Sequence, residues 1–316
     1  MKINKLIIDV AIITLAFLLF ILWYRNSIGD VTQTTFSNIK YYKVYLITTD
    51  KGYQYWDIMN KGAADMAAIT GIDYRWEAPS ERSTEKQIEI INEAVEDGAN
   101  AIIVAADDPK YISGAIEDAK AKGVKVIYVD SPAYEEAITT LATDNFEAGV
   151  QAGQTMISLL DMAGIKSGSI GIINLAAKAN TKLREVGFRD TLANDARFKV
   201  LDTIYTETDK PDLTQRAAER MIHENENLVA LFGTSEGTSI GVGNAIKAND
   251  NKYIGVGFDK TEDMIKLLQD GNLKAIIDQN PYTMGYLGMA EAIAAILGKN
   301  TGPEYINTGV SVVKER

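Results

Sequence analysis

Hydrophobic residues in this chain form one long uninterrupted run, followed by short apolar segments that recur at intervals. The run covers residues 6–24, with Lys2 and Lys5 before it and Trp23 and Tyr24 at its end. A helix of that length spans about 28 Å, close to the thickness of the hydrocarbon core of a bilayer. Lysines before the helix and aromatic residues at its far end are typical of a membrane span with a cytoplasmic amino terminus.

A cleavable signal peptide is the alternative interpretation of this run, and two features argue against it. No small-x-small cleavage site lies close behind Tyr24, and a chain without cysteine has no lipoprotein signal. We therefore predict a single-pass anchor in the cytoplasmic membrane over residues 1–25, with the rest of the chain extracytoplasmic. Residues 26–41 are polar and are expected to form a linker.

Beyond the linker, short apolar segments alternate with longer segments of amphipathic pattern. The apolar segments predict strands at 43–48, 72–76, 101–105, 124–130, 169–175, 199–205, 228–232, 253–258 and 273–278. The amphipathic segments predict helices at 59–68, 83–97, 111–122, 146–162, 181–194, 213–225, 238–247, 263–270 and 284–297.

This alternation of strand and helix is the pattern of parallel sheets that are covered by helices on both faces. The strands are too many for one sheet, so we predict an α/β fold of two doubly wound, parallel-sheet lobes. Such sheets bind ligands at the carboxyl ends of their strands. Residues at these ends are therefore the first candidates for a functional site.

Composition excludes several classes of function. The chain has 32 Lys and Arg against 43 Asp and Glu, and this formal charge of −11 argues against nucleic acid as a partner. It has no cysteine, and its single histidine, His223, makes a histidine-based metal site or catalytic triad implausible. The sequence contains neither of the glycine-rich phosphate-binding motifs. We therefore expect no cofactor, no metal and no enzymatic activity.

The predicted strand ends carry aromatic, carboxylate, amide and guanidinium side chains. The candidates, in chain order, are Tyr55, Trp56, Asp130, Ser131, Arg184, Ser235, Asp259 and Gln279. A flat ring covers the C–H face of a sugar, and carboxylate and guanidinium groups bind neighbouring hydroxyls in a bidentate manner. This set of side chains therefore indicates a site for a neutral polyol.

Several of these residues also have a structural alternative. Asp130 and Asp259 end strands and could cap helices or turns, and Trp56 could belong to the core because apolar residues follow it at helical spacing. Asp107 and Asp108 also follow a strand, but we expect them to cap a helix rather than to bind a ligand.

Six short motifs occur along the part of the chain that follows the predicted linker. They are Tyr55-Trp56-x5-Gly62-Ala63, Val126-Ile127-Tyr128-Val129-Asp130, Thr143-Asp144-Asn145, Arg184-Glu185-x-Gly187-Phe188, Val256-Gly257-Phe258-Asp259, and Gly271-Asn272-Leu273 followed by Asp278-Gln279. By these motifs, the chain from about Tyr42 to its C-terminus resembles the periplasmic sugar-binding proteins of the ribose-binding type.

The resemblance implies a type I periplasmic-binding-protein fold, in which two lobes are joined by a hinge of three crossover strands and close over one sugar. It implies an N-terminal lobe of residues 42–143 with 280–308. The C-terminal lobe would then comprise residues 144–279 with 309–316.

The resemblance also implies roles for the candidate residues. Tyr55 and Trp56 are expected to flank the sugar ring, and the hydroxyls are expected to be bound by Asp130, Arg184, Asp259 and Gln279. Ser235 stands where the family usually has Asn, and Ser131 stands where it often has Arg. Loss of that arginine removes a bidentate clamp and argues against ribose. It leaves a different pentose, with xylose favoured, or a related small polyol.

Three functions from different classes remain. We predict a membrane-tethered sugar-binding protein that signals closure to a sensor kinase, as in xylose-sensing members of the family paired with LytS-type histidine kinases. The alternative is the solute-binding component of a sugar ABC transporter with a membrane permease as its partner. A sugar-active enzyme is the remote alternative, because a glycosidase needs two carboxylates at a defined separation. A membrane tether suits either of the first two, since it raises the effective concentration of a membrane partner.

Overall fold

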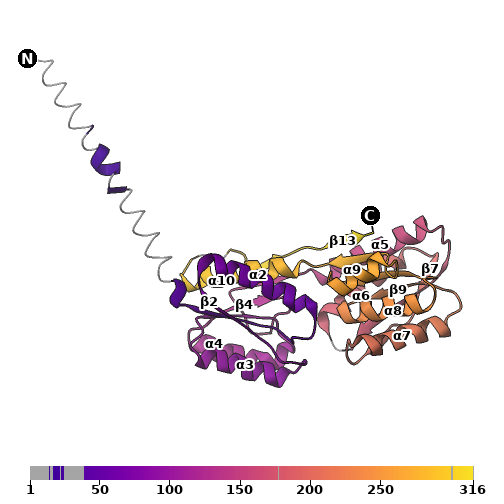
Figure 1. Cartoon of the computed structure of the whole chain (residues 1–316), viewed down its shortest axis with the longest axis horizontal. Helices are drawn as coiled ribbons and strands as arrows, with labels where there is room; N and C mark the ends of the chain where they lie inside the picture. The colour runs from indigo at the N-terminus through magenta and orange to yellow at the C-terminus, as the bar shows by residue number, and fades with distance from the viewer. Residues whose placement is uncertain are drawn as a thin grey trace, which may run out of the picture.

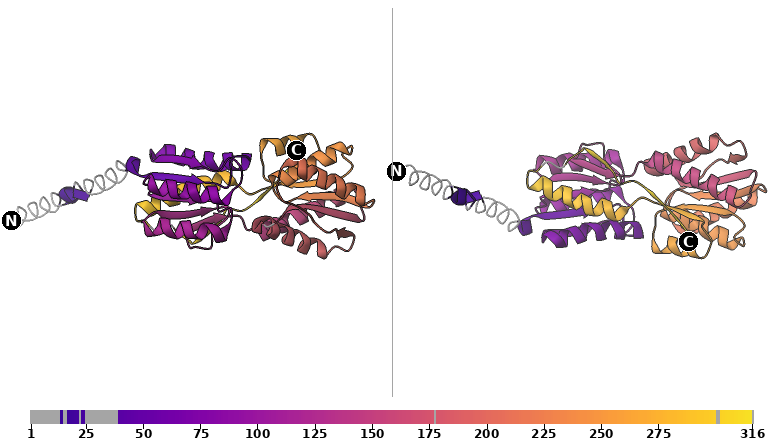
Figure 2. Two further views of the ribbon diagram at one scale, coloured as in Figure 1. Left: turned by 90° about the horizontal axis from the view of Figure 1, so that it is seen from below. Right: turned by 90° about the horizontal axis from the view of Figure 1, so that it is seen from above.

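The computed structural model describes residues 14, 17–21, 23–24, 39–176, 178–299 and 302–315. The described residues form two sheets that lie side by side, each between layers of helices (Figure 1, Figure 2). The predicted α/β fold with parallel sheets is confirmed.

The N-terminal lobe is built on a sheet of six parallel strands. Their order is β12 (Tyr305–Asn307), β5 (Thr139–Ala142), β4 (Lys125–Val129), β3 (Ala101–Val104), β1 (Lys43–Ile47) and β2 (Asp73–Glu77). The short 3-10 turn η1 (Ile39–Tyr41) precedes β1. Leu46 packs toward α2 (Gln54–Thr70) and α10 (Pro281–Ile296), whereas its neighbour Ile47 packs toward α3 (Thr84–Glu96) and α4 (Pro109–Ala121). Alternate residues of a buried strand thus fill two separate cores.

The C-terminal lobe is built on a sheet of seven strands. Their order is β13 (Ser311–Lys314), β11 (Ala275–Asp278), β10 (Ile254–Phe258), β9 (Leu228–Gly233), β6 (Gly168–Leu175) and β7 (Phe198–Val200), and β8 (Ile204–Thr206) also pairs with β6. Only β13 runs antiparallel to its neighbour among the described strands. The helices are α5 (Asn145–Met162), α6 (Ala179–Ala193), α7 (Pro211–Glu224), α8 (Glu236–Ala248) and α9 (Glu262–Gln269). The predicted single strand at 199–205 is wrong, because two short strands stand in its place.

The chain passes between the two sheets three times, from β5 to α5, from β11 to α10, and from β12 to β13 (Figure 2). Asn280 joins two of these crossings. Its backbone is left-handed at φ 58°, and its side-chain amide donates to the backbone oxygen of Thr308 at 3.0 Å. The limits predicted for the lobes, 42–143 with 280–308 and 144–279 with 309–316, stay a prediction.

In each lobe, glycines allow close backbone contact between two helices. A Cβ atom added to Gly62 of α2 or Gly285 of α10 would lie 2.1 or 1.9 Å from a backbone oxygen of the facing helix. Gly149 of α5 and Gly187 of α6 show the same relation, with 2.1 Å for each. These close contacts involve α2, which carries Tyr55, and α6, which carries Arg184.

The predicted anchor lies mostly outside the described residues. Residues 14, 17–21, 23 and 24 of the apolar run are described and helical, whereas the rest of residues 1–25 and residues 26–38 are not described. The part of the chain that the structure describes contains no helix with the length and apolar character of a membrane span. The anchor and the linker therefore stay predictions.

Candidate functional site

Tyr55 and Asp130 meet at the edge of the N-terminal lobe that faces the other lobe. The Tyr55 hydroxyl, on the first turn of α2, donates to Asp130 Oδ1 at 2.9 Å. Asp130 follows β4 with a left-handed backbone at φ 60°, which turns its side chain away from the strand. Its second carboxylate oxygen accepts a hydrogen bond at 3.3 Å from the side-chain amide of Asn180 on α6. Asp130 therefore receives one hydrogen bond from each lobe.

Arg184, Gln279 and Asp259 form a buried chain of hydrogen bonds in the C-terminal lobe. Arg184 Nη2 donates to Gln279 Oε1 at 2.9 Å, and Gln279 Nε2 donates to Asp259 Oδ1 at 2.5 Å. The guanidinium also donates to Asn145 Oδ1 and to the backbone oxygen of Thr234, so its three nitrogens each have a partner. These contacts hold the guanidinium in one orientation.

Arg184 is also fixed by an aromatic ring. Its guanidinium carbon lies 3.8 Å from the centre of the Phe258 ring, the last residue of β10. A guanidinium stacked on a ring keeps its edge free for hydrogen bonds. Arg184 is therefore a buried cation rather than a solvated surface charge.

Three of the predicted site residues bond elsewhere. Ser131 Oγ donates to the backbone oxygen of Ala106 at 2.9 Å, and Ser235 bonds with Thr238 at the start of α8. Trp56 is buried in the N-terminal core, and its indole N–H donates to Asp50 at 3.3 Å. Trp56 keeps an edge-on contact with Tyr55, with ring centres 4.8 Å apart. The roles predicted for all eight residues in ligand binding stay predictions.

Burial changes the pKa values of ionisable groups in this region. Burial raises the pKa of Asp259 to about 6, while Arg184 and the hydrogen bond from Gln279 oppose that rise. The Asp130 carboxylate raises the same pKa, because it lies close enough to repel Asp259. Burial also raises the pKa of Tyr55 well above its ordinary value, so its hydroxyl remains a hydrogen-bond donor at neutral pH.

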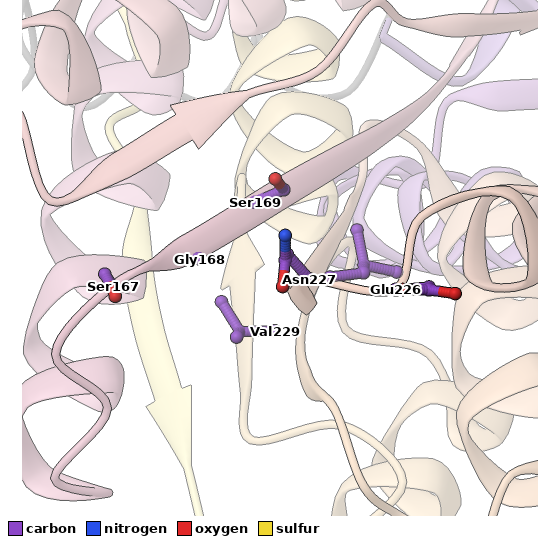
Figure 3. Close-up of a pocket in the computed structure, with 7 residues that line it drawn as sticks. Ser167, Gly168, Ser169, Glu226, Asn227 and Val229 are labelled. Carbon is purple, nitrogen blue, oxygen red and sulfur yellow. The ribbon is translucent and has the colours of Figure 1, made fainter.

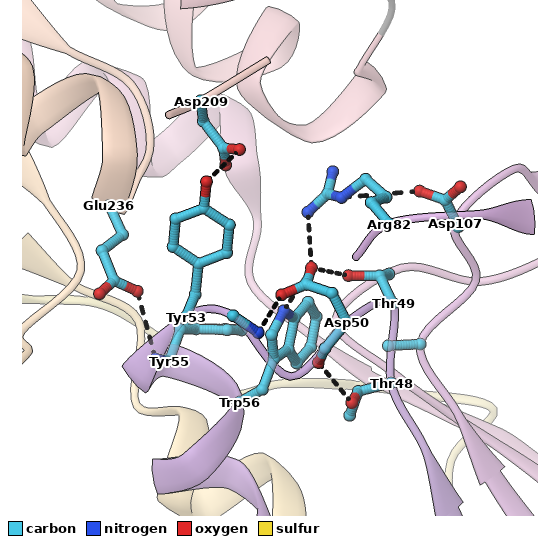
Figure 4. A network of polar contacts seen from close by, with 12 residues as sticks. Thr48, Thr49, Asp50, Tyr53, Tyr55, Trp56, Arg82, Asp107, Asp209 and Glu236 are labelled. Atoms are coloured by element: carbon cyan, nitrogen blue, oxygen red, sulfur yellow. Dashed lines mark hydrogen bonds and ion pairs between the residues drawn. The ribbon is translucent and has the colours of Figure 1, made fainter. Parts of the chain in front are cut away.

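A second polar cluster lies beside the first and also joins the lobes (Figure 4). Arg82 contacts Asp50 at 3.5 Å and Asp107 at 3.8 Å within the N-terminal lobe. Lys178 of the C-terminal lobe pairs with Asp107 at 2.7 Å. Asp107 thus takes part in an interlobe ion pair, and the prediction that it caps a helix is wrong. The same prediction holds for the next residue, since Asp108 accepts hydrogen bonds from two N–H groups at the start of α4.

Asn180, Arg82 and Lys178 were not predicted from the sequence. Arg82 follows β2, and Asn180 and Lys178 lie in the segment between β6 and Arg184. All three follow a strand of a parallel sheet, and that position is the signal in the sequence that could have identified them. Their partners in the opposite lobe are not visible in the sequence.

Other features of the described residues bear on function. A hollow of about 510 Å³ lies at the amino ends of β6 and β9, lined by residues such as Ser167, Glu226 and Asn227 (Figure 3). It contains none of the predicted site residues, which lie at the opposite ends of the strands. No group of three or more His, Cys, Asp or Glu side chains placed to hold a metal ion occurs among the described residues.

The arrangement can bind a neutral, hydroxyl-rich molecule. Asp130 and Asp259 offer acceptor oxygens, and Tyr55, Asn180 and Arg184 offer donors from two facing lobes. Each of these groups is already oriented by a protein partner.

A family model described as a periplasmic binding protein domain matches residues 44–300 of the chain. Among curated relatives, the ribose import binding protein RbsB of Haemophilus influenzae is 25% identical over 222 residues, 70% of this chain and 74% of that protein. The xylose/arabinose-binding protein XylF of Sulfolobus acidocaldarius is 24% identical over 246 residues, 72% of this chain and 59% of that protein.

Among solved structures, an ABC transporter solute-binding protein of Burkholderia graminis in complex with D-arabinose is similar to this chain. It has 27% sequence identity and a TM-score of 0.81, and the match covers 88% of this chain and 96% of that chain. The named relatives are binding proteins, which confirms the prediction that this chain is not an enzyme.

Proposed function

The chain belongs to the periplasmic binding protein family, and from that premise we propose that it binds a small monosaccharide between its lobes, outside the cytoplasmic membrane. The observation that carries this proposal is the meeting of both lobes at Asp130. Its carboxylate accepts from Tyr55 of the same lobe and from Asn180 of the other. A sugar at this point would exchange these protein partners for its own hydroxyls.

The C-terminal lobe supplies the second half of the proposed site. Arg184, Gln279 and Asp259 would bind further hydroxyls, and the aromatic rings of Tyr55 and Trp56 would face the sugar ring. A ligand that contacts both lobes binds the closed form more tightly than the open form. Binding therefore shifts the population toward closure, which changes the surface offered to a partner protein.

A pentose is the ligand class we favour, with xylose as the first candidate. The pentoses named for the relatives above, ribose, arabinose and xylose, support this class. Ser131 argues against ribose among these pentoses, because its hydroxyl donates to the backbone oxygen of Ala106 and provides no bidentate clamp for a sugar.

Two membrane partners are candidates. The description of relatives as import and ABC transporter proteins supports delivery of the sugar to an ABC permease. The apolar run at residues 6–24 supports a second role, in which a tethered protein reports closure to a histidine kinase. Purification of the tagged full-length protein from its own membranes distinguishes them, since either a permease or a kinase is expected to accompany it.

A thermal-shift screen tests the binding function. Full-length protein in detergent is heated with pentoses, hexoses and polyols, and a ligand that binds the native state raises the melting temperature. We expect a selective rise with one pentose. Absence of a shift with every sugar would refute sugar binding.

The tether has a separate test. We expect the full-length protein to fractionate with membranes and to retain residues 1–24. N-terminal sequencing that begins near Thr32 would instead show that the run is cleaved.

A further inference from the structure

Helix α2 begins without a cap from its own lobe. The first N–H groups of a helix have no partner within the helix, and a side chain at the preceding position usually accepts from one of them. That position in α2 is Tyr53, which makes no such bond in the described structure. The Tyr53 hydroxyl instead reaches across to Asp209 of the C-terminal lobe, at 2.6 Å (Figure 4).

The missing cap comes from the opposite lobe. Glu236, the first residue of α8, accepts a hydrogen bond from the backbone N–H of Tyr55 at 3.2 Å (Figure 4). The Glu236 side chain is buried, and its carboxyl group lies at the first turn of α2. The carboxyl group of Glu236 thus caps α2, as a side chain at the position of Tyr53 ordinarily would.

The reverse contact is also present. Helix α9 of the C-terminal lobe begins after Thr261, whose side chain makes no cap bond in the described structure. Gln54, the first residue of α2, supplies that cap: its Oε1 accepts from the backbone N–H of Glu262 at 2.8 Å. Each of the two helices is therefore capped by a residue from the other lobe.

Three other helices of the same lobes are capped locally. Ser83 caps α3, Asp108 caps α4 and Asp144 caps α5, each through its own side chain. These local caps do not depend on the relative position of the lobes. The caps supplied by Glu236 and Gln54 exist only when the lobes are together.

We propose that Glu236 and Gln54 exchange helix caps between the lobes, and that this exchange maintains a closed population without any sugar. Opening the lobes would expose both helix starts to water and break both bonds. Glu236 and Gln54 act here as positioning residues, because they hold the first turn of α2 and so the ring of Tyr55. The proposal does not depend on which ligand the protein binds.

The test measures lobe separation in the sugar-free, full-length protein. Because the chain has no cysteine, spin labels can be placed by Glu117→Cys on α4 and Arg220→Cys on α7, both exposed positions. Electron–electron resonance distances then report the ratio of closed to open molecules. We expect a short-distance population in the labelled parent, and a fall in the closed-to-open ratio of about 2- to 30-fold in Glu236→Ala or Gln54→Ala, as for the loss of one helix cap.

Two further variants separate capping from other effects. Glu236→Gln keeps an acceptor oxygen and is expected to retain the parent distances. Ser83→Ala removes a local cap in the N-terminal lobe, so we expect a lower melting temperature and unchanged distances. A parent without a short-distance population, or distances unchanged in both alanine variants, would overturn the proposal. Thermal unfolding of each variant shows that it is folded.

Discussion

In the C-terminal lobe, Arg184, Gln279 and Asp259 are bonded to one another and to their own lobe, whereas in the N-terminal lobe Asp130 takes one of its hydrogen bonds from across the interface. The exposed fractions agree: Arg184 is 3%, Asp259 5% and Gln279 2% exposed, but Asp130 is only partly buried. One half of the candidate site is therefore prepared within its lobe, and the other half is completed by closure. Substitutions in the two halves should differ in whether they affect folding or binding.

The largest effect is expected for Arg184→Met. The substitution leaves the Asp259 carboxylate buried without its cation and deprives Asn145 and Gln279 of a donor. Breaking a buried charge pair costs about 3–5 kcal/mol, so we expect a loss of that order in the free energy of unfolding, measured by urea denaturation. Arg197→Met, which breaks exposed ion pairs in the same lobe, is the control and should change stability little. Equal stability of the two variants would contradict the comparison.

Asp130→Ala should act on binding rather than on folding. A hydrogen bond to a charged group contributes about 1.5–3 kcal/mol, so calorimetry should show sugar affinity weakened by roughly 10- to 150-fold. Its free energy of unfolding should remain close to that of the parent, because Asp130 is only partly buried. Glu117→Ala removes an exposed carboxylate of the same lobe and provides the control. Unchanged affinity in Asp130→Ala would remove this residue from the site.

The two lobes are alike in having glycines where two helices pack closely, and substitutions at these glycines test that similarity. Gly62→Ala and Gly187→Ala each force a methyl group against a backbone oxygen at 2.1 Å, and we expect each to lower the free energy of unfolding by about 1–3 kcal/mol. Gly114 on α4 has no atom within 4 Å of an added Cβ, so Gly114→Ala should stabilise by about 0.4–1 kcal/mol. Thermal or urea unfolding of the three variants decides this, and a destabilised Gly114→Ala would contradict the packing argument.

The last effect concerns the pH dependence of stability. Burial and the neighbouring Asp259 raise the pKa of Glu236 to about 8, from an ordinary value of 4.5, while the N–H groups of Tyr55 and Gln54 and the Thr261 side chain oppose the rise. A folded-state pKa above the unfolded value contributes stability that is full below about pH 4.5 and is lost as pH rises through 8. Asp259 adds a similar loss as pH rises through its pKa of about 6.

We therefore expect Glu236→Gln to become more stable relative to the parent as pH rises. Urea denaturation of both proteins at about pH 5, 7 and 9 measures the difference in the free energy of unfolding. Because Asp259 is common to the two proteins, its main contribution cancels. A stability difference that is constant across this range would show that Glu236 titrates normally.

The sequence predicted the layered α/β fold because buried parallel strands give continuous apolar runs such as 101–105. It did not predict β5, β12 or β13, which are short. The apolar pattern is weak in β12 and β13 because they are partly exposed, and in β5 because two of its four residues are threonines. It also joined β7 and β8 into one strand, since the segment between them carries no glycine or proline to mark a break.

The sequence placed Tyr55, Asp130, Arg184, Asp259 and Gln279 at strand ends or in the segments that follow them, and the structure brings each of them into polar contact with at least one other. It could not predict the partners Asn180, Lys178 and Glu236. Each of these contacts depends on the relative position of two lobes, which a pattern of strands and helices does not determine.

The most direct test is a crystal structure of the full-length protein with the pentose that gives the largest thermal shift. The proposed function predicts sugar hydroxyls within hydrogen-bonding distance of Asp130 in one lobe and of Arg184 or Asp259 in the other. A sugar that contacts one lobe only, or that occupies the hollow beside Ser167, would contradict it.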